Sequence, residues 1–151
     1  MIKHFGGVLC LSFLATPVCS EDAMVEAAHR AMADKLYAKG SIPLLEFASR
    51  NGFSLEKTES AIRVMFDGFA RCSIDFMVAR PESEFRTVLE LTAKDAPQDD
   101  FVEALGPWVV SMTEILDEHR EELIACKEPI KKELFIQFES LADTEEENTN
   151  R

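Results

Sequence analysis

Apolar side chains recur at helical spacing along nearly all of the chain after the first twenty residues, and no run of alternating apolar and polar β-formers appears. The first helix is expected over residues 22–38, with Gly40 ending it in a left-handed cap. A short second helix is expected next, because Pro43 fits the first turn of a helix, and residues 51–52 (Asn-Gly) are expected to end it.

Residues 54–79 predict a long helix that is apolar over more than half of its circumference, which is typical of the centre of a bundle. Gly68 costs this helix about 1 kcal/mol of propensity, and a small residue there favours a close crossing with another helix. The remaining strip carries charges that alternate in sign at a spacing of four: Arg63, Asp67, Arg71 and Asp75. We interpret this strip as a solvated face with ion pairs, and a recognition stripe is the alternative.

Proline and glycine divide the second half of the chain. Helices are predicted over residues 81–94, over residues 97–126, and from Pro129 onward. Gly106 and Pro107 interrupt the second of these, so a kink or two consecutive helices are expected there.

The chain contains no repeat of fixed period and no linker long enough to separate two domains. Residues 143–151 are polar and acidic and are expected to form a flexible tail. The pattern therefore predicts one all-α domain over residues 21–142, an orthogonal or mixed bundle of five to seven helices with one disulfide.

The first twenty residues have the composition of a secretory leader. Lys3 supplies a short positive region, and residues 5–15 are uncharged and mostly apolar. Pro17 ends the helix, and Val18 and Ser20 are small enough for a signal-peptidase site. The apolar stretch is shorter than the roughly 20 residues that a membrane-spanning helix needs. Cleavage after Ser20 is expected, and a lipoprotein modified at Cys19 is the disfavoured alternative.

Cleavage leaves two of the four cysteines, Cys72 and Cys126, which are expected to form a disulfide in an exported chain. The bridge would close a loop of 126 − 72 = 54 residues. The chain-entropy model assigns roughly 4 kcal/mol to a loop of that size. Both cysteines lie on the main apolar stripe of their helices, so the bridge is expected inside the core.

The composition is acidic, with 28 Asp+Glu against 16 Lys+Arg and a formal net charge of −12. Loss of Lys3 with the leader would bring the charge to −13. Nucleic-acid binding is disfavoured, because phosphate contacts need clustered Lys and Arg on one face.

Candidates for catalysis or metal binding are few. The mature chain has two histidines, and Glu26 with His29 forms a single Glu-x-x-His pattern. A di-iron bundle needs that pattern twice together with further inward carboxylates, so no metal and no other cofactor is expected. The chain also lacks a Gly-x-Ser-x-Gly elbow and a phosphate-binding glycine loop, so an enzyme is disfavoured.

The favoured function is the binding of another protein by an exported, periplasmic or secreted, non-enzymatic protein, such as an inhibitor, an immunity protein or an assembly factor. An acidic cluster suits a basic partner: Glu114, Asp117, Glu118, Glu121 and Glu122. The candidate contacts are Arg63, Asp67, Arg71, Asp75, Trp108, Glu118 and Glu122. The alternative is a carrier of an apolar small molecule, which a closed apolar cavity of at least ~300 Å³ in the bundle core would favour. A metal-dependent enzyme is the least favoured function.

Overall fold

The computed structural model describes the backbone of residues 21–149 and the side chains as far as residue 140. The predicted leader, residues 1–20, lies outside the described residues. Regular structure in the described range is entirely helical, which confirms the predicted all-α class: α1 (Glu21–Arg50), α2 (Leu55–Val78), α3 (Ser83–Ala93), α4 (Gln98–Leu105), the 3-10 helix η1 (Gly106–Trp108), α5 (Val109–Glu118) and α6 (Arg120–Thr149).

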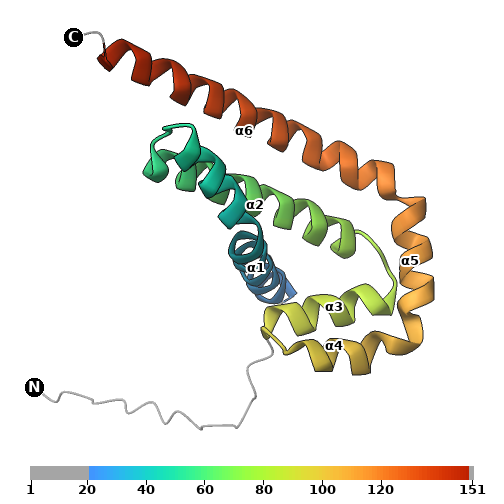
Figure 1. The fold of residues 1–151 in the computed structure, drawn as a ribbon. Helices are drawn as coiled ribbons and strands as arrows, with labels where there is room; N and C mark the ends of the chain where they lie inside the picture. The colour runs from blue at the N-terminus through green and yellow to red at the C-terminus, as the bar shows by residue number, and fades with distance from the viewer. Residues whose placement is uncertain (1–20, 150–151) are drawn as a thin grey trace, which may run out of the picture.

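The helices form a packed group and a connecting arm. α1, α2 and α3 pack on one another, and α6 lies along α2 (Figure 1). α4 runs beside α3, and α5 leads from this pair to the start of α6 (Figure 1). We call α4, η1 and α5 together, residues 98–118, the arm.

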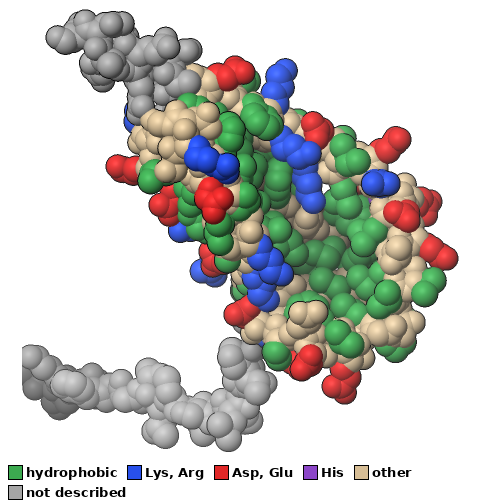
Figure 2. All heavy atoms as spheres, viewed as in Figure 1, with side chains coloured by type: hydrophobic (Ala, Val, Ile, Leu, Met, Phe, Trp, Pro, Cys, Tyr) green, Lys and Arg blue, Asp and Glu red, His purple; other side chains and the backbone are tan. Residues whose placement is uncertain are grey.

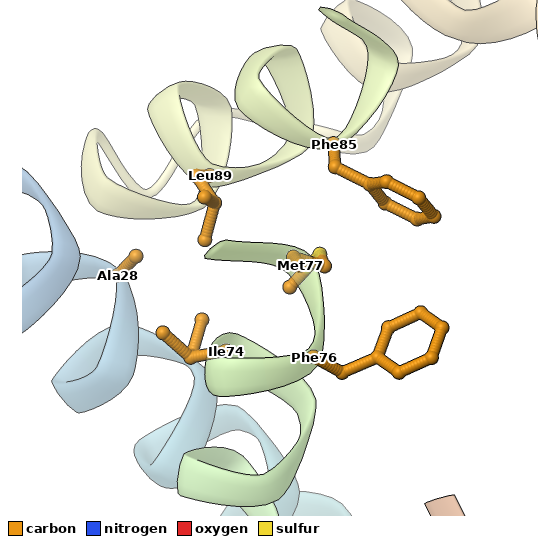
Figure 3. Close-up of a cluster of buried hydrophobic side chains, with 6 residues drawn as sticks. All are labelled: Ala28, Ile74, Phe76, Met77, Phe85 and Leu89. Atoms are coloured by element: carbon orange, nitrogen blue, oxygen red, sulfur yellow. The ribbon is translucent and has the colours of Figure 1, made fainter. Parts of the chain in front are cut away.

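Two clusters of buried side chains hold the packed group together. The first joins α1, α2 and α3 and consists of Ala28, Ile74, Phe76, Met77, Phe85 and Leu89 (Figure 3). The second lies between α2 and α6 and consists of Ala61, Ile62, Met65, Phe66, Leu134 and Phe138. Because α2 contributes to both clusters, it is the central helix of the bundle, as its broad apolar face predicts.

α1 is longer than the sequence pattern predicts. The expected end at Gly40 and the expected new helix at Pro43 are both wrong, because α1 continues through these residues to Arg50. A Cβ atom built on Gly40 would collide with the ring of Phe66. This glycine therefore permits the close packing of α1 on α2, and its sequence signature resembles that of a helix end.

The predicted end at residues 51–52 is confirmed. Gly52 has φ 76°, in the left-handed region, and the Phe53 amide donates to the Ala48 carbonyl at 3.0 Å. The ring of Phe53 lies 6.0 Å from the ring of Phe138, centroid to centroid, and so packs over the end of α1 against α6.

The predicted close crossing at Gly68 is also confirmed. A Cβ atom built on Gly68 would lie 2.9 Å from Cδ1 of Ile130, which is closer than side chains normally approach. The absence of a side chain on Gly68 therefore sets how closely α2 and α6 approach.

The last helix begins earlier than predicted. α5 ends at Glu118 and α6 begins at Arg120, so the predicted start at Pro129 is wrong and this proline lies inside α6. Pro129 has no backbone N–H, so one hydrogen bond of α6 is missing. Packing of the following turns of α6 against α2 holds the helix together at this point. The predicted interruption at residues 106–107 is confirmed, because η1 separates α4 from α5 there. The backbone of the predicted tail is helical as far as Thr149.

Candidate functional site

The predicted disulfide is present between Cys72 of α2 and Cys126 of α6, with Cα atoms 6.0 Å apart. Its predicted position inside the core is only half correct, because Cys72 is buried and Cys126 is exposed. Cys126 is exposed because α6 lies on the outer side of α2, and α2 covers only one face of α6. The bridge therefore links the first third of α6 to the C-terminal third of α2.

A second set of contacts between α2 and α6 lies near the disulfide, at the C-terminal end of α2. The guanidinium of Arg80 lies over the Phe76 ring, with Cζ 3.4 Å from the centroid, and Nη1 donates to the Phe76 carbonyl at 2.8 Å. Nη2 also donates to Glu122 Oε2 at 2.8 Å, and the same carboxylate lies 3.2 Å from Nδ1 of His119. The predicted contact residue Glu122 thus ties α6 to α2, and this pairing offsets part of its charge.

Sequence reasoning did not single out Arg80. One signal was available, because a cation just beyond the last turn of a helix interacts favourably with the free carbonyls there. Phe76 lies four residues before Arg80, one helical turn away, and so was also a local signal. Glu122 lies 42 residues away, and only the fold brings it to Arg80.

An open apolar hollow of about 310 Å³ lies between the packed group and the arm. The space-filling view shows hydrophobic side chains gathered on the concave face between α2, α3, α5 and α6 (Figure 2). The rings of Phe76 and Phe85 project on the same side of the first buried cluster (Figure 3). The hollow is lined by Met32, Ser73, Phe76, Met77, Phe85, Val88, Met112, Leu116, Leu123 and Lys127.

Lys127 is the only charged residue among those lining the hollow. Its Nζ lies 6.0 Å from the centroid of the Phe69 ring. Partial burial lowers the pKa of Lys127 below its ordinary value of 10.5, and the nearby charge of Lys131 lowers it further. The hollow therefore combines an apolar wall with one poorly hydrated cation.

The exposed surface of the arm combines apolar side chains with acidic ones, whereas the charge in the hollow is a cation. No side chain of α4, η1 or α5 is fully buried. Val110 is 72% exposed, Val102 is 64% exposed, and the predicted contact residue Trp108 is 37% exposed. Residues 98–118 include six Asp or Glu and no Lys or Arg, and the predicted contact residue Glu118 is exposed at the end of α5.

The charged strip of α2 is largely engaged with neighbouring side chains. Arg63 lies over the Tyr37 ring at 3.9 Å and pairs with Glu59 at 3.3 Å. Asp75 is exposed beside a small cleft at the disulfide. The strip therefore faces α1 in part, and its predicted interpretation as a set of ion pairs describes Arg63 well.

The middle of the strip surrounds a buried histidine. His29, 4% exposed, lies with Nε2 3.2 Å from Asp67 Oδ1 and Nδ1 3.1 Å from Arg71 Nη2. Arg71 lies 3.7 Å from Glu26 as well. The carboxylate of the Glu-x-x-His pattern, Glu26, thus lies against Arg71, and His29 links α1 to α2.

Within the described residues, no group of three His, Cys, Asp or Glu side chains converges on a point where a metal ion would sit. No helix of residues 21–149 has a stretch of apolar residues long enough to cross a bilayer. Comparison with known proteins finds no matching family model, no matching curated protein and no matching solved structure.

Proposed function

We propose that this protein is exported by its N-terminal leader to the periplasm or the cell exterior, where it binds a basic protein partner without catalysing a reaction. The leader is inferred from residues 1–20, and the Cys72–Cys126 disulfide is consistent with an oxidising compartment. An inhibitor, an immunity protein or an assembly factor would act in this way.

The observation that carries the proposal is the surface of the arm. Its helices bury no side chain completely, yet they expose Val102, Trp108, Val109 and Val110. Exposed apolar side chains that contribute little to the core often mark a surface that a partner covers.

The charge of the arm specifies the kind of partner. Six Asp or Glu and no Lys or Arg within 98–118 create a negative field around the exposed apolar side chains. Such a field speeds the approach of a positively charged protein and repels an acidic one. The arm would therefore bind a surface that has apolar anchors within a ring of Lys and Arg.

Site-specific photocrosslinking in cells that make the protein tests the proposal. A photoreactive phenylalanine analogue replaces Val110, which is 72% exposed on the arm, or Lys57, which is exposed in the first turn of α2. We expect a discrete crosslinked protein from position 110 and none from position 57.

The captured protein is then purified and titrated with wild-type protein and with a charge-reversed variant carrying Glu114→Lys and Asp117→Lys. We expect a slower association rate for the variant, and a wild-type rate that falls as salt is raised. Equal crosslinking from both positions, or an association rate insensitive to the charge reversal, would contradict the proposal.

A second candidate function is the carriage of an apolar small molecule. The specific observation in its favour is the hollow of about 310 Å³, in which eight of the ten lining residues are apolar. This volume is at the lower end of the roughly 300–1,000 Å³ range of small-molecule sites. The hollow is open to solvent, and so differs from the closed cavity in the bundle core that we expected for a carrier.

A further inference from the structure

The hollow and Lys127 together specify a ligand class, which rests on the second candidate function and does not depend on the protein-binding proposal. The apolar wall comes from five helices, with Met32 on α1, Phe76 on α2, Phe85 on α3, Met112 on α5 and Leu123 on α6. The hydroxyl of Ser73, the other polar lining residue, donates to the Phe69 carbonyl at 3.1 Å. A ligand in the hollow would therefore meet apolar surface almost everywhere except at Lys127.

The position of Lys127 is unusual for this chain. Acidic residues outnumber basic ones by 28 to 16, yet no residue lining the hollow is Asp or Glu. Within the described residues, the structure records no carboxylate within 4 Å of the Lys127 ammonium group, whereas the neighbouring Lys131 pairs with Glu128 at 2.7 Å. A cation that lines an apolar hollow and has no paired carboxylate is complementary to an anion that carries an apolar chain.

We propose that the hollow binds a single-chain amphiphile with a carboxylate headgroup, whose chain lies along Val88, Met112 and Leu116 and whose carboxylate contacts Lys127. The lowered pKa of Lys127 agrees with this placement, because partial loss of water without a compensating anion disfavours the charged ammonium. A bound carboxylate would favour the charged form and would raise that pKa.

Calorimetric titration of the purified, disulfide-bonded protein with three ten-carbon probes tests the headgroup: decanoate, decanol and decylammonium. We expect decanoate to bind most tightly and decylammonium most weakly. We expect affinity to rise about fourfold for each added methylene between octanoate and dodecanoate, since each methylene leaves water for the hollow.

Variants separate the headgroup from the chain. Lys127→Gln is expected to weaken decanoate binding about tenfold and to leave decanol binding unchanged. Lys132→Gln removes an exposed lysine of the same helix that does not line the hollow, and should leave both affinities unchanged. Met112→Glu should weaken all decanoate binding, because it places a carboxylate in the hollow.

Proton NMR of the lysine side chains gives a second measurement. The pKa of Lys127 should rise when decanoate is added and should stay constant when decanol is added. Equal affinity for decanoate and decanol, with no effect of Lys127→Gln, would overturn the headgroup assignment.

Two further outcomes would overturn the proposal as a whole. One is the absence of decanoate binding together with binding of a basic amphipathic peptide that Met112→Glu abolishes, which would make the hollow a peptide groove. The other is binding to phosphatidylglycerol vesicles but not to free decanoate, which would indicate a membrane surface as the source of the anion. Crosslinking at Val110 reports on the arm separately, so either proposal can fail alone.

Discussion

The packed group of α1, α2, α3 and α6 differs sharply from the arm of α4, η1 and α5. Residues of the packed group such as Ile62, Ile74 and Phe85 are at most 1% exposed. The arm buries no side chain completely, and Val110 remains 72% exposed. Both regions are helical, so secondary structure alone does not distinguish a helix that stabilises the fold from one that is available to bind.

The difference in burial between the two regions suggests that the packed group stabilises the fold and that the arm is available to bind. Burial in the packed group supplies the free energy of folding, and this group holds the two ends of the arm, at α3 and at α6. The arm is then free to keep apolar and acidic side chains in contact with water.

The largest expected effect comes from truncating a core aromatic. Phe85→Ala should lower the free energy of unfolding by about 3–5 kcal/mol, because Phe85 is 1% exposed and its ring packs against Phe76 at 5.7 Å. Val110→Ala in the arm should change it by less than about 0.5 kcal/mol. Urea denaturation followed by circular dichroism measures both, and similar losses for the two variants would remove the distinction.

Removing the disulfide should have the next largest effect. The double variant Cys72→Ala/Cys126→Ala should lose up to about 4 kcal/mol, because the bridge closes a loop of 54 residues in the unfolded chain. Reductant should destabilise the wild type to a similar extent and leave the double variant unchanged. A wild type insensitive to reductant would mean that the non-covalent contacts around Arg80 suffice to hold α6.

Alanine substitutions at two glycines should change the stability of the protein in opposite directions. Gly40→Ala should destabilise the protein by about 1–3 kcal/mol, because the added methyl group would collide with the buried Phe66 ring. Gly106→Ala should stabilise it by about 0.4–1 kcal/mol, because φ is −48° there and a Cβ atom would meet nothing within 4 Å. Thermal unfolding of the two variants checks the signs, and equal signs would contradict the account.

The smallest predicted effect concerns Tyr37, the only tyrosine in the chain. Burial raises the pKa of its phenol above 10.0, and the hydrogen bond to Glu59 Oε1 at 2.9 Å raises it further. Since the folded pKa is raised, the resulting stabilisation is complete below pH 10 and is lost as the pH rises through the folded pKa.

Ultraviolet absorbance during alkaline titration reads the Tyr37 phenol directly. Glu59→Gln should lower its pKa toward the ordinary value, and Glu114→Gln in the arm should leave it unchanged. A wild-type pKa equal to that of a free phenol would mean that the α1–α2 contact is looser than the structure indicates.

The parts of the fold that local pattern determines were predictable. The broad apolar face of 54–79 predicted the central helix, and the cysteine count predicted the disulfide. Gly40 and Pro129 misled the prediction, because a glycine that permits close packing and a proline held inside a helix have the local sequence of helix ends. Only the packing between helices shows the difference: Phe66 of α2 lies against Gly40 of α1, and Ile130, next to Pro129 in α6, lies against Gly68 of α2.

The candidate site was less predictable than the fold. Its acidic and aromatic residues were visible in the sequence, and Trp108 and Glu118 do lie exposed on the arm. The hollow depends on the path of α5 away from α2, which no local pattern specifies. Lys127 was overlooked for the same reason, because nothing in its neighbourhood along the chain shows that it borders a hollow.

Hydrogen–deuterium exchange of the native protein tests the central claim most directly, because it measures the stability of each helix in the same molecule. The account predicts that amides of α4 and α5 exchange at least about a hundredfold faster than amides of α2 around Ile62 and Phe66, and that the arm becomes protected when its partner binds. Uniformly slow exchange across all helices, with no change on binding, would show that the arm is part of the stable core and would contradict the account.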